Sequence, residues 1–548
     1  MVIARLLPIG ERAFLLEVAA LPEVLALHGA LEQSRPAGIT DLVPAARTVL
    51  VRFDPRVLPA ESARAWASEA ARDAAPIDRS AAPLVELDLV YDGADLAGTA
   101  ELMHVSVEAL VRRHSEARWA VAFTGFAPGF GYLVSDDWPY DVPRLASPRT
   151  RVPAGAVGLA AGFSGAYPRE TPGGWRLIGT TDARLFDPDA ASPALLSPGA
   201  RVRFRPVRER VASADAARVG AAGAPADAAR VGAAGAVADD DLPTADDPPT
   251  AAHAGVAPAT AGARIVEPGL LATLQDLGRP GAASLGVATS GALDRGALRT
   301  ANRLLGNLEG AAGIEVTMGG FRAVAQSDLW FAVTGAWGAL RLDGREVDPY
   351  SALAWPAGAE LHMDWFAHGA RAYLAVRGGW DGRTALGSRS TDLLAGLGGD
   401  ALRPGDEVAV GARVASPVPV AALAPWGAPH DDELVLELAP GPRADWFAPS
   451  AHGDLFDAVW TVSNDADRVG VRLEGPELRR VRADELPSEG MVAGALQVPP
   501  SGRPTILLAD GPVTGGYPVI AVVTDASLDL VAQARPGTRI RFRHARGG

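Results

Sequence analysis

The sequence of 548 residues contains no cysteine. A disulfide framework, a thiolate nucleophile, an iron–sulfur cluster and a zinc site built from thiolates are therefore excluded. Because disulfides are the usual sequence mark of an oxidising compartment, the chain carries no indication of its redox surroundings.

Lysine is also absent, so every fixed positive side chain is an arginine. A Walker-type phosphate loop needs its lysine, and a Schiff base with a carbonyl compound or pyridoxal phosphate needs a side-chain amine. Biotin is likewise carried on a lysine, so no covalently bound biotin is possible on this chain. Codon bias in an Ala- and Arg-rich proteome is the plain explanation for the absence, and it leaves these exclusions unchanged.

Long apolar runs are missing too. Charges at Glu11, Arg12 and Glu17 interrupt the beginning of the chain, unlike the apolar region of a signal peptide. No stretch of about 20 apolar residues is available to span a bilayer. The net charge of −14 argues against a nucleic-acid binder, which normally has a basic patch. We expect a cytoplasmic protein with no membrane and no nucleic-acid partner.

Common catalytic motifs are not found. The sequence has no G-x-S-x-G nucleophile elbow and no H-E-x-x-H helix. Its nine histidines are scattered and form no i,i+4 pair that could hold a metal. A histidine metal site is therefore not expected, and the ligands of any metal are unknown from the sequence.

One segment differs in composition from the rest of the chain. Residues 214–224 and 226–236 share the sequence ADAARVGAAGA, and a stretch rich in Asp, Pro and Thr follows. Large apolar side chains are nearly absent there, so the segment cannot bury enough surface to offset its ordering entropy. We predict that residues 211–262 are a disordered linker between two halves; a pair of Ala-rich helices is the alternative.

Each half ends with the same three short elements in the same order. They occupy residues 152–159, 172–179 and 198–205 in the first half and residues 492–498, 514–520 and 536–543 in the second, with a fainter copy of the last at 403–410. Pro-Gly is a turn, and Arg-Val-Arg-Phe-Arg alternates as a strand with one buried face does. Short strands separated by Gly and Pro turns are typical of barrels or sandwiches.

Helices are few in the predicted fold. The clearest lie over residues 20–34, 60–73 and 103–116, a further helix is expected over 294–306, and residues 48–53 read as a strand. We therefore predict a mainly β protein in which a small α+β N-terminal domain precedes tandem β-barrels. The predicted segments are 1–80 for the α+β domain, 81–210 for a barrel, 211–262 for the linker, and 263–412 and 413–548 for two further barrels.

Two clusters in the first half combine glycine, aromatic rings and arginine. Residues 123–133 read FTGFAPGFGYL, which predicts a rigid loop lined with rings and open to close backbone approach. Arg149 and Arg151 alternate on a predicted strand, so both guanidinium groups share a face suited to carboxylate or phosphate. A packed barrel turn and a solvated strand face are the structural alternatives. The binding candidates from this half are Phe126, Gly129, Arg149, Arg151, Gly173 and Gly174.

The second half has several turn-rich polar clusters, including residues 275–281, 386–392, 463–468 and 510–517. Asp276, Asp294 and Asp510 are the candidate catalytic carboxylates, because such groups act as general bases or hold Mg²⁺. Capping and solvated turns are the alternative for each cluster. The binding candidates here are Gln275, Arg279, Asn302, Ser388, Arg389, Thr514, Gly515, Gly516 and Tyr517.

These motifs resemble a known family. The first half, through GFAPGFGYL, PRTRVPAGAVG and TPGGWRLIG, resembles the B subunit of 5-oxoprolinase, in the Kip-type inhibitor or allophanate hydrolase subunit 1 family. The second half, through PGLLATLQDLGRPG, GVATSGALD, GSRSTD and GMVAGALQVPPSGRPTILLADGPVTGGYP, resembles the C subunit, in the allophanate hydrolase subunit 2 family. The chain is therefore similar to a fusion of both subunits. The carboxyltransferase module of urea carboxylase and urea amidolyase is related.

The resemblance implies cyclophilin-like barrels and an ATP-dependent opening of 5-oxo-L-proline to L-glutamate. It also implies ATP, Mg²⁺, a small amide substrate and a separate partner like the A subunit of 5-oxoprolinase, and it leaves homo-oligomerisation open. Arg149, Arg151 and Arg279 are the phosphate-clamp candidates under this reading. Thr180, Pro512 and Val513 stand where the family usually has other residues.

Two other functions are open. The same pair of halves could move a carboxyl group from carboxybiotin to urea or another amide, and a chain without lysine would then need a separate biotin carrier. Alternatively, the chain could be a binding protein that inhibits a sensor kinase, as the sporulation inhibitor of this family does. Fusion of both halves argues mildly against the inhibitor, because a one-to-one ratio suits a shared active site.

Overall fold

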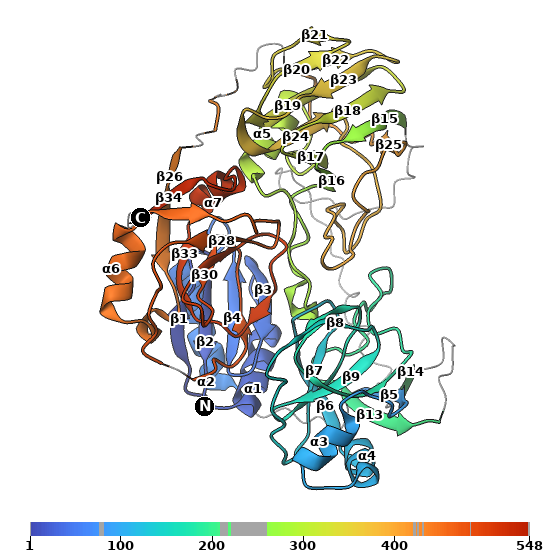
Figure 1. Ribbon diagram of the computed structural model, residues 1–548, viewed down its shortest axis with the longest axis vertical. Helices are drawn as coiled ribbons and strands as arrows, with labels where there is room; N and C mark the ends of the chain where they lie inside the picture. Colours follow the sequence, from blue (N-terminus) through green and yellow to red (C-terminus); the bar gives the residue numbers. More distant parts are fainter. Residues whose placement is uncertain are drawn as a thin grey trace, which may run out of the picture.

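The computed structural model describes residues 2–75, 82–208, 217–220, 260–419, 424, 427–429, 432–482 and 484–545. Within these residues strands far outnumber helices, which confirms the mainly β fold class. Figure 1 shows four units: the N-terminal domain (2–75), the first barrel (82–208 with 217–220), the sandwich unit (260–419) and the C-terminal barrel (432–545).

The N-terminal domain is a four-stranded antiparallel sheet with two helices, in the strand order β1-β2-β4-β3. Its central strands are apolar on both faces. Phe14 and Val49 point to the core beneath the helices, whereas Leu15 and Leu50, their neighbours in sequence, point to the opposite face. The elements are β1 (Arg5–Pro8), β2 (Ala13–Glu17), α1 (Leu21–Gln33), β3 (Ile39–Pro44), β4 (Thr48–Phe53) and α2 (Ala60–Asp73).

The first barrel is an eight-stranded sheet in the order β12-β9-β10-β7-β6-β13-β5-β14, beside the small pair β8–β11. Strand β13 runs parallel to β5 and antiparallel to β6. The elements are β5 (Leu84–Leu89), α3 (Leu96–Leu102), α4 (Val107–Glu116), β6 (Trp119–Thr124), β7 (Gly131–Val134), β8 (Arg149–Val152), β9 (Ala156–Ala160), β10 (Phe163–Ala166), β11 (Thr171–Gly173), β12 (Arg176–Thr180), β13 (Arg201–Pro206) and β14 (Ala217–Gly220).

The sandwich unit has two sheets, ordered β21-β20-β23-β18-β15-β25 and β16-β17-β24-β19-β22. The elements are β15 (Thr260–Pro268), β16 (Leu271–Gln275), η1 (Ala283–Leu285), α5 (Arg295–Leu304), β17 (Gly313–Thr317), β18 (Phe321–Ala325), β19 (Leu329–Trp337), β20 (Leu340–Leu342), β21 (Arg345–Glu346), β22 (Leu353–Trp355), β23 (Glu360–Met363), β24 (His368–Val376) and β25 (Glu407–Val410).

The C-terminal barrel is closed, in the order β26-β33-β30-β31-β28-β27-β34. Its last strand, β34, runs parallel to β26 and antiparallel to β27, the same pairing that β13 makes in the first barrel. The elements are β26 (Glu433–Pro440), η2 (Ala444–Trp446), α6 (Pro449–Asp457), β27 (Trp460–Val462), β28 (Gly470–Glu474), β29 (Glu489–Gly490), β30 (Ala495–Gln497), β31 (Thr505–Leu507), β32 (Thr514–Gly515), β33 (Val519–Val523), α7 (Asp525–Ala532) and β34 (Arg539–His544).

Three predictions need correction. The helix expected over 103–116 is two helices, because Ser106 accepts a hydrogen bond from the Ala109 amide and so begins a new helix at Val107. The predicted linker 211–262 is not disordered throughout: β14 pairs with β5, and β15 begins at Thr260. The remaining linker residues lie outside the described part. In 263–412, two sheets replace the expected barrel, and β25 pairs antiparallel with β15.

The two halves pack against each other within one chain. Figure 1 shows the N-terminal domain beside the C-terminal barrel, far from it in sequence. Leu15 and Leu50 share a hydrophobic core with Met491, Val519 and Val522. Burial of each such side chain stabilises the contact by about 1.5–3 kcal/mol. Among the described residues no helix is long and apolar enough to cross a membrane.

Candidate functional site

A cavity of about 220 Å³ lies where three parts of the chain meet. One wall comes from the β1–β2 turn and β4 of the N-terminal domain, and another from residues that precede and begin α5. The C-terminal barrel and the first turn of α7 form the rest. Both halves of the chain therefore build this cavity, which we call the arginine cavity because of its lining.

Four arginines line the arginine cavity, two from each half of the chain: Arg12, Arg52, Arg295 and Arg299. Arg52 follows Leu50 by two residues on β4, so it lies on the sheet face that contacts the C-terminal barrel. Arg295 and Arg299 are four residues apart in α5 and therefore share one face of that helix.

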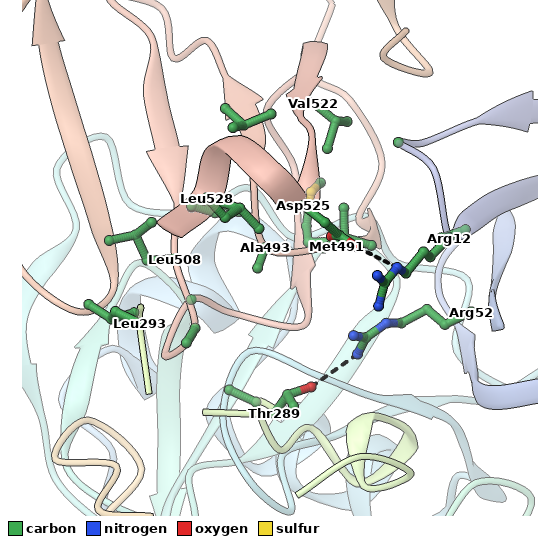
Figure 2. Close-up of a pocket in the computed structure, with 18 of the residues that line it drawn as sticks. Arg12, Arg52, Thr289, Leu293, Met491, Ala493, Leu508, Val522, Asp525 and Leu528 are labelled. Atoms are coloured by element: carbon green, nitrogen blue, oxygen red, sulfur yellow. Dashed lines mark hydrogen bonds and ion pairs between the residues drawn. The ribbon is translucent and has the colours of Figure 1, made fainter. Parts of the chain in front are cut away.

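Acidic and hydroxyl groups hold two of these arginines. Arg12 forms an ion pair with Asp525 at the start of α7. The Arg52 Nη1 donates to Thr289 Oγ1 at 3.0 Å and lies 3.3 Å from the buried Asp41 Oδ2. Figure 2 shows Arg12 and Arg52 extending side by side from the N-terminal domain, with Asp525 and Thr289 at the ends of their dashed contacts.

Charged side chains of both signs surround the cavity. Four guanidinium groups and the carboxylates of Glu11, Asp525 and Asp529 line it, and a fourth carboxylate, that of Asp41, contacts Arg52 from outside the lining. Asp529 accepts hydrogen bonds from the backbone amides of Arg295 and Gly296, and burial raises its pKa. Burial, followed by the nearby Arg299, lowers the pKa of Arg295. An added negative charge would relieve this crowding of cations.

Two adjacent hydroxyl residues, Thr289 and Ser290, form a polar part of the wall. Ser290 is only 3% exposed and has a left-handed backbone with φ of 55°. Its hydroxyl donates to Asp510 Oδ1 at 2.6 Å. Asp510 in turn binds the Arg468 guanidinium, with Nε to Oδ2 at 2.8 Å and Nη2 to Oδ1 at 3.1 Å.

Behind this wall lies a buried charge network. Arg468 Nη1 donates to Glu315 Oε1 at 2.6 Å, and Glu315 Oε2 accepts from the Tyr373 hydroxyl at 2.8 Å. The carboxylates of Glu315 and Asp510 outweigh burial and raise the pKa of Arg468 above its ordinary value. A buried arginine between two carboxylates fixes the position of Asp510.

Comparison with known proteins identifies the family to which the chain belongs. The family described as "Carboxyltransferase domain, subdomain C and D" matches residues 4–196, and "Carboxyltransferase domain, subdomain A and B" matches residues 285–544. The C subunit of 5-oxoprolinase from Escherichia coli (strain K12) is 36% identical over 284 residues, 51% of this chain and 90% of that protein. The chain belongs to this carboxyltransferase-domain family.

Other relatives match different shares of the chain. The B subunit of 5-oxoprolinase from Escherichia coli O157:H7 is 47% identical over 130 residues, 23% of this chain and 60% of that protein. The urea amidolyase of Lachancea kluyveri is 32% identical over 51% of this chain and 16% of its own length. The crystal structure of TTHA0988 covers 97% of this chain and 100% of its own, with 34% identity and a TM-score of 0.78.

These similarities confirm the predicted resemblance to joined B and C subunits, and we call residues 2–220 the B-like half and residues 260–545 the C-like half. The arginine cavity then has a simple description. The B-like half contributes Arg12 and Arg52, and the C-like half contributes Arg295, Arg299 and the hydroxyl wall.

The three predicted carboxylates do not share one open site. Asp510 and Asp294 lie directly behind the lining, beside the cavity residues Gly511 and Arg295. Asp294 caps α5, with Oδ1 accepting from the Ala297 amide and Oδ2 from Gln533 Nε2, and burial raises its pKa to about 7. The side chains of both residues point into the protein.

Asp276 is held elsewhere. It accepts hydrogen bonds from the hydroxyls of Ser388 and Ser390, both at 2.6 Å, and from the amides of Gly278 and Arg389. Across the described ranges, no group of three or more His, Asp or Glu side chains is arranged to hold a metal ion. The sequence assigned no ligands to Mg²⁺, and Mg²⁺ stays a prediction from the family resemblance.

The predicted binding residues near Asp276 form hydrogen bonds and an ion pair within the protein. Arg279 is buried and donates to the carbonyls of Ala385 and Ser390. Gln275 donates to Thr273 and to the Thr391 carbonyl. The remaining two residues are placed as follows: Asn302 ties the end of α5 to the carbonyls of Glu309 and Ala311, and Arg389 pairs with Asp381 at 2.7 Å.

The aromatic loop and the C-terminal glycine turn meet across the two halves. The Phe126 amide donates to Thr514 Oγ1 at 3.1 Å, and the Gly129 amide donates to the Leu285 carbonyl at 2.9 Å. Phe126 and Tyr517 are 40% and 47% exposed. Gly515 and Gly516 lie on the same turn, where Gly515 faces the Gln497 side chain.

The predicted arginine clamp of the first barrel lies away from the arginine cavity lining. Arg149 pairs with Asp95 at 2.7 Å, and Arg151, whose side chain is 75% exposed, pairs with Glu170. Gly173 pairs with Arg149 across β8 and β11, and the adjacent Gly174 faces Pro148. These residues form a separate hairpin surface.

Sequence reasoning missed the four arginines of the cavity and Thr289. Arg12 and Arg52 belong to no recognised motif, and their position depends on the packing of the N-terminal domain against a barrel more than 400 residues later. Thr289 lies within the motif GVATSGALD and Arg295 directly follows it, but neither residue was singled out as a site residue.

Proposed function

We propose that this chain is the joined B and C component of a 5-oxoprolinase. With a separate protein like the A subunit of that enzyme, it hydrolyses 5-oxo-L-proline to L-glutamate at the expense of ATP. The observation that carries this proposal is the arginine cavity, to which the B-like and C-like halves each contribute two guanidinium groups.

The cavity suits a small organic acid. At about 220 Å³ it is smaller than the roughly 300–1,000 Å³ typical of pockets for drug-sized ligands. A planar carboxylate matches the donor fork of arginine, and apolar residues such as Leu293, Met491 and Val522 cover the rest of the lining. A five-membered ring with one carboxylate has this combination of charge and apolar surface.

The chemistry explains why ATP is required. A lactam carbon is poorly electrophilic, and transfer of the γ-phosphoryl group to the lactam oxygen converts that oxygen into a leaving group. Two waters are consumed overall, so 5-oxoproline, ATP and two H₂O yield glutamate, ADP and phosphate. The part assigned to this chain is to hold the carboxylate with its arginines and to exclude bulk water. Since no carboxylate cluster suited to Mg²⁺ is present in the described residues, no step is assigned to the metal.

Glutamate release from 5-oxoproline with ATP and Mg²⁺ tests the proposal. The chain is assayed alone, with the A subunit, and as Arg52→Ala with the A subunit. We expect glutamate only in the mixture, and a raised KM for Arg52→Ala because a cavity guanidinium is lost. Full activity of the A subunit without this chain, or no activity in a mixture in which both proteins bind each other, contradicts the proposal.

Carboxyl transfer is a second candidate, favoured by the carboxyltransferase-domain match and by the similarity to urea amidolyase. Because the chain has no lysine, carboxybiotin would have to arrive on another protein. Transfer of labelled carboxylate from a biotinylated carrier to urea, with no glutamate formed from 5-oxoproline, supports this candidate over the hydrolase.

A further inference from the structure

Thr289 and Ser290 are adjacent in the cavity wall, but their hydroxyls are left with opposite hydrogen-bonding capacity. Thr289 Oγ1 accepts from Arg52 Nη1 at 3.0 Å. A guanidinium can only donate, so the Thr289 hydroxyl hydrogen is available to an acceptor in the cavity. Ser290 Oγ donates to Asp510 at 2.6 Å, so its lone pairs are available to a donor in the cavity.

Buried ion pairs maintain this difference. Asp510 is 4% exposed and is held by two hydrogen bonds from Arg468, which keep its oxygens as acceptors for the Ser290 hydroxyl. Arg52 is held in turn by Asp41, which is also buried. Neither hydroxyl can reverse its role without losing a charge-assisted bond, and such bonds are stronger than neutral ones.

The backbone at Ser290 is strained in a way that points to function. A φ of 55° is rare for a residue with a side chain, and such conformations persist only where surrounding contacts impose them. Here the Ser290 amide donates to the Ala509 carbonyl at 3.0 Å, and the Thr289 carbonyl accepts from the Arg279 amide at 2.8 Å. These contacts keep both hydroxyl residues on the cavity wall.

We propose that Thr289 and Ser290 recognise the amide edge of a cyclic amide that carries a carboxylate. Thr289 donates to the ring carbonyl oxygen and Ser290 accepts from the ring N–H, while the arginines bind the carboxylate. In a small ring the N–H and C=O are cis and lie side by side, whereas a linear amide is trans and presents them in opposite directions. This inference rests on the proposed function and assigns recognition of the lactam edge to two specific residues.

Three ring acids separate the two contacts. 5-Oxo-L-proline has both groups, 5-oxotetrahydrofuran-2-carboxylate keeps the carbonyl but has no N–H, and tetrahydrofuran-2-carboxylate has neither. Calorimetric titration of the full chain, alone and with the A subunit, measures the affinity for each. We expect wild-type affinity to fall about threefold to tenfold at each of these two steps, since each removes one hydrogen bond.

Variants assign each step to a residue. Ser290→Gly should bind 5-oxoproline and the lactone equally, while the loss of affinity from the lactone to tetrahydrofuran-2-carboxylate remains. Because glycine suits a positive φ, we expect this variant to fold. Thr289→Val should lose the second step and keep the first. Thr181→Val removes a buried hydroxyl of the first barrel outside the cavity lining and should keep both steps.

The outcomes separate this inference from the proposed function. If Ser290→Gly and Thr289→Val keep both steps, or if no probe binds while the mixture releases glutamate, the inference is wrong and the hydrolase proposal stands. If the probes bind with the expected steps but the mixture releases no glutamate, the lactam site stands and the hydrolase proposal falls. Loss of either step in Thr181→Val also overturns the inference.

Discussion

Arg295 occupies a position that folding alone disfavours. It is the first residue of α5, where the positive end of the helix dipole repels a cation, and desolvation together with Arg299 lowers its pKa, although the residue remains exposed to solvent and donates to the Leu277 carbonyl at 3.1 Å. A lowered pKa means that the charged form is less favourable in the folded protein than in the unfolded chain. Such a residue is retained for binding more readily than for stability.

We therefore expect Arg295→Ala to weaken 5-oxoproline binding without loss of stability. The free energy of unfolding should stay unchanged or rise by up to about 1 kcal/mol, because a cation leaves the helix N-terminus. Urea denaturation and the KM in the reconstituted assay measure the two effects. Arg303→Ala, at the other end of α5 and paired with Glu309 at 2.7 Å, is the control and should leave KM unchanged. A large loss of stability in Arg295→Ala would contradict this interpretation.

Arg468 has the opposite character. It is buried between Glu315 and Asp510, and Arg468→Met leaves Asp510 without its cation and Glu315 with only the more distant Arg371, at 3.8 Å. Removal of one partner from a buried ion pair costs about 3–5 kcal/mol, so the midpoint of denaturation should fall sharply. Arg118→Met, which removes an exposed pair with Asp137, should leave the midpoint nearly unchanged. Equal midpoints for the two variants would show that the network is not structural.

At the scale of elements, the loop after β6 packs closely against the turn around β32. A Cβ placed on Gly125 would lie 2.2 Å from Thr514 Oγ1 and 3.1 Å from Thr514 Cβ. Gly125 therefore permits the contact between the B-like and C-like halves.

Gly125→Ala should lower the melting temperature, and Thr514→Ala in the same chain should restore much of it because the clashing hydroxyl is removed. A double-mutant cycle measures this coupling. Gly98→Ala, in α3 with nothing within 4 Å, is the matched control and should be neutral or stabilising by about 0.5–1 kcal/mol. Additive losses in the double variant would mean that the two residues do not press on each other.

The success of prediction from sequence also varied by element. Residues 48–53 and 60–73 were placed with the observed bounds, because their patterns of strand and helix are local. The closing strands β13 and β34 were recognised from Pro-Gly turns and alternation, and they make equivalent pairings. The faint copy at β25 suggested the end of a third barrel, but β25 pairs antiparallel with β15. Alternation indicates a half-buried strand but not its partner or direction.

The candidate site could not be assembled in the same way. Ser290 was part of the motif GVATSGALD, but Arg12 and Arg52 line the cavity only because of tertiary packing. A signal of that packing was present, since residues 49–51 and 13–16 are apolar without alternation, as expected for strands covered on both faces. Asp276 and Arg279 show the opposite case. They are conspicuous polar residues in the sequence, but they form hydrogen bonds with buried groups of the protein and do not line the cavity.

At the scale of the whole molecule, the shared core predicts that the halves stay together without a covalent connection. Besides Leu15 and Leu50, Arg443 of the C-terminal barrel donates to Glu17 of the N-terminal domain at 2.7 Å and also pairs with Glu489. These contacts join the first and last units of the chain.

Cleavage at a protease site inserted between residues 221 and 259 should leave both fragments in one complex. Size-exclusion chromatography after cleavage should show co-elution at the position of the intact chain, with 5-oxoproline binding retained. Leu50→Glu, which places a charge in the shared core, should release the fragments after the same treatment. If the fragments separate when Leu50 is retained, the covalent connection holds the molecule together.

The same shared core has a consequence for synthesis on the ribosome. The outer face of the N-terminal sheet, with Leu7, Leu15 and Leu50, is covered by residues near 491–522. At about 5–20 residues per second, translation leaves this apolar face without its partner for roughly 20–90 s. A nascent chain in that state is a natural client for chaperones, and expression of the B-like half alone should make the same face a starting point for aggregation.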